Sequence, residues 1–265
     1  MPPLSSPSPS PSSYDGVVAT LRAAGCVFAE DEAQLILGAA RDTGELAAMV
    51  RRRANGLPLE LVLGWAEFRG LRITVEPGVF VPRRRTEFLV EQALAQAPGA
   101  SVVVDLCCGS GAVGTALAAA LGQVELHAAD IDPAAVCCAR RNVPDVGGHV
   151  HAGDLFEALP RELRGRIDIL AANVPYVPTG EVGLLPPEAR DHEPLVALDG
   201  GADGLDVLRR VAAEAPRWLA PGGCLLVETS ERQAPAAVEA FLGAGLTTRL
   251  AVSEELYAHV VIGSL

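Results

Sequence analysis

The spacing of apolar residues changes along the chain and divides it into segments of different kinds. Between residues 14 and 63 the apolar positions recur at helical spacing, and Leu46, Met49 and Val50 share one face of a segment that closes at Gly56. Acidic residues lie in the first turn of one such segment and arginines in the last turn of another, which suits the helix dipole. The pattern predicts a small N-terminal domain of three short amphipathic helices over 14–63.

A different pattern follows over residues 65–81, where apolar and polar residues alternate around a turn that contains glycine. This alternation is typical of a β-hairpin. We therefore expect a β-hairpin linker over 64–84. A helix should follow it, with Thr86 as the expected N-cap.

From Ser101 onward, continuous apolar runs alternate with amphipathic ones. The expected strands are SVVVDL, VELHAAD, HVHAGD, IDILAAN and GCLLVET, with a last pair near GLTTRLAV and YAHVVIG. The expected helices cover residues 112–121, 133–142, 203–220 and 232–244. This alternation favours an α/β fold with a doubly wound, mostly parallel sheet in a domain over 85–265. Ligands of such sheets bind beyond the carboxyl ends of the strands, so the residues that follow each strand form the candidate site.

Composition agrees with this division and narrows the class of protein. A chain of 265 residues with 49% hydrophobic and 20% charged residues suits a soluble globular protein with one large or two unequal domains. No apolar run reaches the ~18 residues of a membrane span. Residues 1–13 are rich in proline and serine and lack the features of a secretory signal, so we expect a disordered tail and a cytoplasmic protein.

Charge and cysteine content exclude several kinds of chemistry. The net charge is −12, and all 21 basic residues are arginines. Without lysine the chain has no Walker-A phosphate site and no Schiff-base chemistry, and its acidity argues against binding a nucleic-acid backbone. None of the 6 cysteines has C-x-x-C spacing, so we expect buried, reduced thiols and no metal site.

The first strand of the sheet region runs into DLCCGSGAVG, where Gly109, Gly111 and Gly114 form the pattern G-x-G-x-x-G. Several kinds of nucleotide site share that pattern. Asp105 separates them, because a carboxylate at the strand tip would repel a dinucleotide's pyrophosphate and suits a cationic ligand such as the amino group of S-adenosylmethionine. The glycines are expected to let the backbone approach that ligand closely.

Acidic residues also follow the next two strands. Asp130 is placed to accept both ribose hydroxyls. Asp154 is placed to accept from the exocyclic amine of adenine, with the Leu155 N–H facing a ring nitrogen. Each acid has a structural alternative, because Asp130 could cap the helix that begins at Pro133 and Asp154 could be a turn residue. Three acids on three successive strand tips favour an adenosine ligand.

The fourth strand ends in AANVPYVP, residues 171–178. Asn173 offers a side-chain oxygen acceptor, and Val174, which precedes a proline, is pushed into the extended region that projects its carbonyl outward. Pro175 fixes the turn, and Tyr176 adds an aromatic wall. Two acceptors beside a flat surface can hold an –NH₂ group on a planar carrier. The alternative is an Asx turn with a packed tyrosine.

Taken together, these segments resemble the PrmC/HemK protein-(glutamine-N5) methyltransferases. The resemblance rests on VPRRRTE, VVDLCCGSGAVGTALA, AADIDPAAVCCARRN, GDLF, NVPYVP and DHEPLVALDGGADGLDVLRRV, in the order that the family has. It implies a seven-stranded class I S-adenosylmethionine-dependent methyltransferase core and a helical domain that docks the substrate. The implied reaction is methylation of the side-chain amide of a protein glutamine, in the best-known case the Gly-Gly-Gln glutamine of class-1 peptide chain release factors.

The resemblance also implies residue roles. The donor S-adenosyl-L-methionine is bound by a set that comprises Asp105, Cys107, Cys108, Gly109, Ser110, Gly111, Asp130, Ile131, Asp154, Leu155 and Asn173. The acceptor glutamine is held by Asn173, Val174, Pro175 and Tyr176. The family's motif is Asn-Pro-Pro-Tyr, and Val174 keeps the carbonyl that matters while it gives up ring stiffness. Cys107, Cys108 and Arg84 are further departures, which leave the identity of the protein substrate open.

Other functions stay open from the sequence. The implied mechanism relies on positioning and electrostatics without a dedicated base or metal. A nucleic-acid adenine-N6 or other exocyclic-amine methyltransferase would use a similar motif, and a non-catalytic donor-binding module would keep the same fold. Asp105 disfavours a dinucleotide-dependent oxidoreductase. We expect a cytoplasmic monomer whose partner is a release factor, with no direct nucleic-acid or membrane partner.

Overall fold

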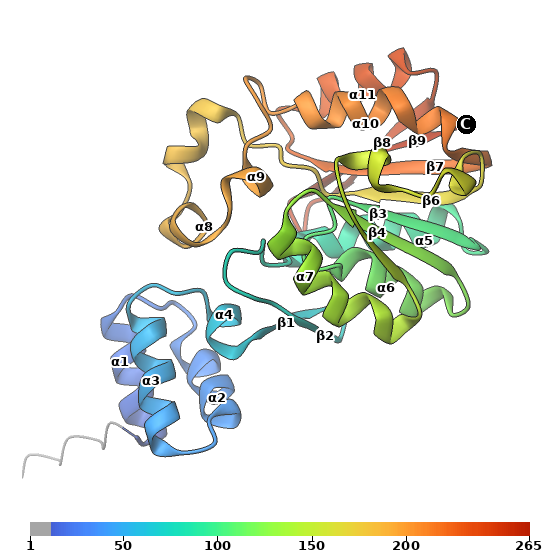
Figure 1. The fold of residues 1–265 in the computed structure, drawn as a ribbon. Helices are drawn as coiled ribbons and strands as arrows, with labels where there is room; N and C mark the ends of the chain where they lie inside the picture. Colours follow the sequence, from blue (N-terminus) through green and yellow to red (C-terminus); the bar gives the residue numbers. More distant parts are fainter. Residues whose placement is uncertain (1–11) are drawn as a thin grey trace, which may run out of the picture.

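The computed structural model describes residues 12–265, and its N-terminal part is helical. Most of the tail expected over 1–13 therefore lies outside the described residues. Four helices pack around one apolar cluster: α1 (Tyr14–Ala23), α2 (Ala29–Ala39), α3 (Thr43–Ala54) and α4 (Leu59–Leu63). The apolar spacing predicted three of them and missed the short α4. Figure 1 shows this bundle set apart from the sheet.

A two-stranded antiparallel hairpin, β1 (Trp65–Phe68) and β2 (Leu71–Thr74), joins this bundle to the rest of the chain. The alternation up to residue 81 is therefore only partly strand. A short 3-10 turn (Arg84–Thr86) and helix α5 (Glu87–Gln96) follow. The prediction that Thr86 caps α5 is wrong, because Thr86 has helical backbone angles and its side chain makes no capping hydrogen bond.

The predicted sheet is confirmed, with seven strands in the order β5-β4-β3-β6-β7-β9-β8. Its strands are β3 (Val102–Leu106), β4 (Glu125–Asp130), β5 (His149–Ala152), β6 (Ile167–Ala172), β7 (Leu219–Thr229), β8 (Thr247–Ser253) and β9 (Ala258–Ser264). The first five are parallel, and β9 is antiparallel to both β7 and β8. The chain proceeds from β3 to one edge and then returns to β6 on the other side of β3. That reversal places a crevice at the carboxyl ends of β3 and β6.

Helices cover both faces of the sheet (Figure 1). One face packs on α5, α6 (Ala112–Leu121) and α7 (Pro133–Asn142), and the other packs on α10 (Asp206–Glu214) and α11 (Ala234–Gly243). Helices α6 and α7 have the predicted bounds. The helix expected over 203–220 is shorter, because residues 199–205 form a loop and a 3-10 turn (Ala215–Arg217) ends it.

A segment between β6 and α10 was not predicted as structured. It holds a 3-10 turn (Thr179–Leu184), α8 (Pro187–His192) and α9 (Leu195–Leu198). An ion pair of 2.7 Å between Arg53 of α3 and Glu188 of α8 ties this segment to the N-terminal bundle. Among residues 12–265, no helix is long and apolar enough to cross a membrane.

Candidate functional site

A cavity of about 1530 Å³ opens at the carboxyl ends of the strands. Ligand pockets for one small molecule commonly measure about 300–1,000 Å³, so this cavity has room for a donor and an acceptor together. All predicted site residues line it except Gly111. The structure therefore brings together side chains that follow four different strands.

Asp105 lies at the tip of β3 and is 1% exposed. Its Oδ2 accepts a hydrogen bond of 2.8 Å from the Gly114 N–H. Burial raises the pKa of this carboxyl group to about 7, although the Gly114 hydrogen bond opposes the shift. A cationic ligand group would favour the ionised form.

Two of the three glycines in the G-x-G-x-x-G pattern do not have the expected role of letting the backbone approach a ligand. A Cβ at Gly114 would lie 3.0 Å from Leu126 Cδ1 and 3.1 Å from Asp105 Cβ. A Cβ at Gly111 would lie 2.6 Å from a methyl group of Val143. These two glycines therefore allow the chain to pack on itself, and only Gly109 has open space around its Cα.

Cys107 occupies a backbone conformation that glycine favours, with a φ of 54°. Burial raises the pKa of the Cys107 thiol far above its usual range, and nearby Asp130 and Asp105 raise it further. The thiol therefore stays protonated and is a poor nucleophile. Its neighbour Cys108 is buried, and both cysteines are free thiols.

Asp130 at the end of β4 is oriented by two backbone donors. Its Oδ2 accepts from the Gly109 N–H at 2.8 Å, and its Oδ1 accepts from the Asp132 N–H at 2.9 Å. Asp132, and not Asp130, caps α7 by accepting from the Ala134 N–H at 2.9 Å. The alternative role of Asp130 as a helix cap is thus removed, and its carboxylate remains in the cavity wall.

The turn after β5 contains Gly153 with a φ of 151° and Leu155 with a φ of 48°. Both values are unusual for residues with side chains, and Leu155 lies in the cavity wall in this strained conformation. Asp154 Oδ2 is held at 2.6 Å by Arg210 Nη2. The sequence reading did not anticipate Arg210 beside this acid, and one carboxylate oxygen is therefore already engaged.

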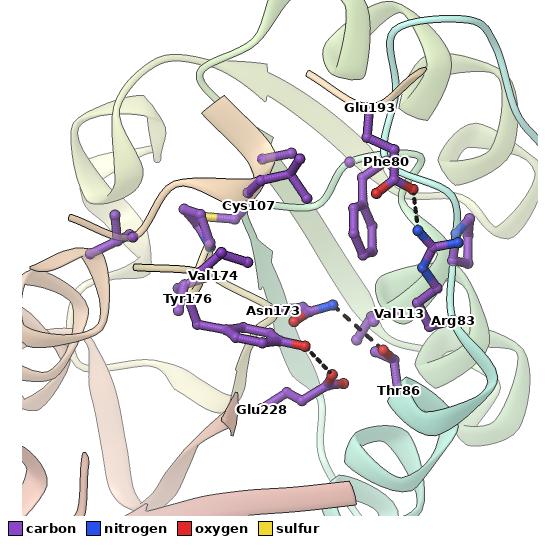
Figure 2. Close-up of a pocket in the computed structure, with 18 of the residues that line it drawn as sticks. Phe80, Arg83, Thr86, Cys107, Val113, Asn173, Val174, Tyr176, Glu193 and Glu228 are labelled. Carbon is purple, nitrogen blue, oxygen red and sulfur yellow. Dashed lines mark hydrogen bonds and ion pairs between the residues drawn. The ribbon is translucent and has the colours of Figure 1, made fainter. Parts of the chain in front are cut away.

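Asn173 follows β6, and its side-chain oxygen Oδ1 is buried without a hydrogen-bond partner. Its Nδ2 donates to Thr86 Oγ1 at 3.5 Å, so the Thr86 hydroxyl faces Asn173 and does not cap a helix. Figure 2 shows Asn173 between Thr86 and the ring of Tyr176. The next residue, Val174, has a side chain that is 1% exposed and belongs to one of the core clusters of the sheet.

Tyr176 is more than an apolar wall. Its hydroxyl lies 2.5 Å from Arg85 Nη2 and 3.3 Å from Glu228 Oε1 (Figure 2 shows the second contact). Burial raises the pKa of the phenol, and the Glu228 charge raises it further, so Tyr176 remains a donor. Neither Arg85 nor Glu228 was identified from the sequence, although Glu228 lies at the end of the predicted strand GCLLVET.

Gln233 and the loop over residues 199–205 hold the backbone of the motif. The side chain of Gln233 donates from Nε2 to the Tyr176 carbonyl at 2.8 Å and to the Asp203 carbonyl at 2.9 Å. A Cβ at Gly204 would lie 2.2 Å from the Tyr176 carbonyl oxygen. The Gly200 N–H also donates to the Val177 carbonyl at 2.9 Å. The turn that carries the acceptor groups is therefore held from two sides.

Unpaired acceptors gather in the cavity wall. Among the described residues, five side-chain atoms are buried without a partner, and four of them belong to residues that line the cavity: Asn173 Oδ1, Glu193 Oε2, Glu228 Oε2 and Thr229 Oγ1. Leaving a buried acceptor unpaired costs about 1–3 kcal/mol. Their concentration at one place points to a ligand that brings hydrogen-bond donors. No group of three or more metal-binding side chains occurs between residues 12 and 265.

Comparisons with known proteins show methyltransferases among the relatives of this chain. A family model described as the methyltransferase small domain matches residues 70–183. The release factor glutamine methyltransferase of Mycolicibacterium smegmatis is 39% identical over 261 residues, which cover 91% of this chain and 92% of that protein. A methyltransferase from Pyrococcus furiosus of known structure has a similar fold, with a TM-score of 0.57, 15% identity, and coverage of 84% of this chain and 98% of that one.

A relative with a different printed activity is also similar. The 4-amino-L-phenylalanine/4-methylamino-L-phenylalanine methyltransferase of Streptomyces pristinaespiralis is 38% identical over 191 residues. The match covers 69% of this chain and 65% of that protein. Two relatives of comparable identity thus carry names with different acceptors.

Proposed function

This chain belongs to the family of release factor glutamine methyltransferases, and we propose that it transfers a methyl group from S-adenosyl-L-methionine to the side-chain amide nitrogen of a protein glutamine. The acceptor is the glutamine of the Gly-Gly-Gln motif in class-1 peptide chain release factors. In this proposal residues 14–63 form the docking domain, residues 64–84 the linker and residues 85–265 the catalytic domain of a cytoplasmic monomer. Nucleic acid and membranes are not partners.

The donor half of the cavity has the groups that this cofactor requires. The buried Asp105 carboxylate suits its cationic amino group, and the Asp130 carboxylate, held by two backbone donors, suits the two ribose hydroxyls. The loop from Cys107 to Gly111 encloses the methionine part, with Ile131 beside the ribose. Asp154 and Leu155 line the adenine end. When bound, the cofactor supplies an electrophilic methyl group.

The acceptor half is formed by the motif at the end of β6. An amide nitrogen is a poor nucleophile because its lone pair is delocalised into the carbonyl. Asn173 Oδ1 and the Val174 carbonyl accept its two hydrogens, which orients the nitrogen and localises electron density on it. Pro175 fixes this turn and the Tyr176 ring limits where the amide can lie. The observation that carries the proposal is the buried, unpaired Asn173 Oδ1 in the wall of the shared cavity.

The first experiment identifies the acceptor. The protein is incubated with labelled donor and with purified release factors from the same cell, and the label is located by mass spectrometry. Label on the Gly-Gly-Gln glutamine is expected, whereas label on another protein or on RNA would overturn the substrate assignment.

The first variant is Asn173→Ala, which removes one acceptor from the nitrogen's binding site. We expect it to abolish turnover and to leave calorimetric binding of S-adenosylhomocysteine measurable. Full activity of this variant would refute the mechanism.

A second acceptor is favoured by the relative that acts on 4-aminophenylalanine, because an aromatic amine also presents an –NH₂ group on a planar carrier. Free 4-amino-L-phenylalanine should therefore be tested as acceptor in parallel with the release factors. Turnover of the amino acid alone would replace the protein substrate by a small molecule. The net charge of −12 and the absence of lysine continue to argue against a nucleic-acid substrate.

A further inference from the structure

Glu228 is a group of the cavity that the proposed methyl transfer does not use. It lies in β7, and its side chain is only 2% exposed. Oxygen Oε1 accepts from Arg85 Nε at 3.0 Å and from the Tyr176 hydroxyl at 3.3 Å. Oxygen Oε2 is buried and has no partner. Figure 2 shows this carboxyl group beside the Tyr176 hydroxyl, in the part of the cavity where Asn173 and Thr86 also lie.

Charge decides what kind of donor fits Oε2. The negative charge of Glu228 is already balanced by the Arg85 guanidinium, so the site needs no further cation. A cationic ligand at Oε2 would also be repelled by that guanidinium. What remains unfilled is hydrogen-bonding capacity, because each carboxylate oxygen can accept about two bonds. The site therefore suits a neutral N–H donor.

A polypeptide acceptor supplies such donors beside its –NH₂ group, and adenine does not. The main chain on either side of a glutamine carries one neutral N–H per residue. Adenine presents the ring acceptor N7 next to its amino group, and an acceptor there would leave Oε2 unpaired. A free amino acid carries an ammonium group, which Arg85 disfavours.

We propose, as an inference that rests on the proposed function, that Glu228 determines specificity for a peptide. Its free Oε2 accepts a hydrogen bond from a main-chain N–H of the substrate close to the acceptor glutamine. Arg85 and the Tyr176 hydroxyl hold the carboxylate in the required orientation. Asn173 and Val174 then select the –NH₂ group, while Glu228 selects the polypeptide that carries it.

The variant Glu228→Gln reverses the hydrogen-bonding character of this position without changing its size. Arginine only donates, so the amide oxygen of the glutamine must face Arg85 and its –NH₂ must take the place of Oε2. We expect KM for the intact release factor to rise about 10- to 100-fold, as for loss of a charged hydrogen bond. The affinity for S-adenosylhomocysteine should stay unchanged, which also shows that the variant is folded.

Glu231→Gln is the matched control. Glu231 lies in the same cavity wall and loses the same charge, but its side chain is exposed. This variant should keep the KM of the unmodified protein. An equal rise of KM in both variants would mean that overall charge, and not a hydrogen bond at Oε2, governs substrate binding, and would overturn the proposal.

A second measurement tests the same contact from the side of the substrate. Synthetic peptides that span the Gly-Gly-Gln loop are prepared with a single N-methyl group on one main-chain nitrogen at a time, and their binding to the protein with S-adenosylhomocysteine is measured. One position should lose affinity with the natural protein and lose nothing further with Glu228→Gln. Equal losses at that position in both proteins would overturn the proposal.

The outcomes also separate this inference from the proposed function. Methylation of the release factor with a KM that Glu228→Gln leaves unchanged would keep the function and refute the role of Glu228. Peptide binding that depends on Glu228 without any methyl transfer would keep the role of Glu228 and refute the function. Absence of both binding and transfer would refute both.

Discussion

The side chain of Gln233 should be essential for the shape of the acceptor site, and Gln233→Glu tests this with almost no change in size. Gln233 is buried, and its Nε2 donates to the Tyr176 and Asp203 carbonyls at 2.8 and 2.9 Å. The Ser230 hydroxyl donates to its Oε1 at 2.5 Å, which leaves Nε2 as the group that faces the two carbonyls. An ionised glutamate would turn an acceptor towards these two carbonyl oxygens.

The cost can be estimated from these contacts. Two hydrogen bonds to backbone carbonyls disappear at about 1 kcal/mol each, and unpaired or repelled groups add to that loss. We therefore expect Gln233→Glu to lose about 2–4 kcal/mol of unfolding free energy at neutral pH. At about 2–4 °C per kcal/mol, the melting temperature should fall by roughly 4 to 16 °C. kcat should fall more than donor binding, because the Tyr176 carbonyl belongs to the turn that carries Asn173.

The pH dependence has a definite sign. Facing two carbonyl oxygens in a buried place raises the pKa of the introduced carboxyl group in the folded state above its unfolded value of about 4.3. The protonated carboxyl group donates one hydrogen bond. Its contribution to the stability of the folded protein is therefore fully present below the unfolded pKa and is lost as pH rises through the folded pKa. Stability and kcat of the variant, relative to the natural protein, should therefore recover as pH falls.

The assay is thermal unfolding and methyl transfer across a pH series, with Gln123→Glu as the control because Gln123 is exposed. The control should lose little stability and show no recovery at low pH. If Gln233→Glu behaves like Gln123→Glu, then the hydrogen bonds to the Tyr176 and Asp203 carbonyls do not position the acceptor turn, and the reasoning is refuted.

Two further predictions concern the donor half of the cavity. Cys107→Gly should raise the free energy of unfolding in urea by about 0.5–1 kcal/mol, because a left-handed conformation costs a residue with a side chain roughly 1–2 kcal/mol and the greater chain entropy of unfolded glycine cancels part of that gain. No gain in stability would show that the φ of 54° is unstrained. Burial raises the pKa of Asp105 to about 7, so the calorimetric affinity for S-adenosylhomocysteine should weaken as pH falls below 7, while Asp105→Asn should bind weakly at every pH. The same dependence of affinity on pH in both proteins would show that Asp105 does not contact the ligand.

The sequence predicted the centre of the sheet well, because strands such as β3 and β6 are buried along nearly their whole length and read as continuous apolar runs. Helices α6 and α7 were also predicted with their bounds, although the residue that caps α7 is Asp132 and not the Asp130 considered from the sequence. Helices α8 and α9 were missed because they are short, lie outside the sheet layers and carry no strong apolar spacing. Their position depends on tertiary contacts such as the ion pair between Arg53 and Glu188.

The candidate site was predictable where one strand tip supplies both the residue and its signal. Asp105, Asp130 and Asn173 all follow this rule, and all line the cavity. Arg85 could not be found this way, because it precedes α5 and 143 positions separate it from its partner Glu228. Glu228 does lie at the end of β7, but its sequence position gives no sign of this ion pair. Only the fold places the segment before α5 against the end of β7.

The position of Val174 bears on where substrate specificity resides. Its side chain is 1% exposed and belongs to the same apolar cluster as Leu106 and Leu205, while the group proposed to contact the acceptor is its carbonyl. Exchanging a proline for valine there changes packing behind the site and keeps the acceptor oxygen. Arg85 instead contacts Tyr176 and Glu228 with its side chain inside the cavity wall. A change of substrate is therefore expected to follow substitutions in the VPRRRTE segment more closely than substitutions at Val174.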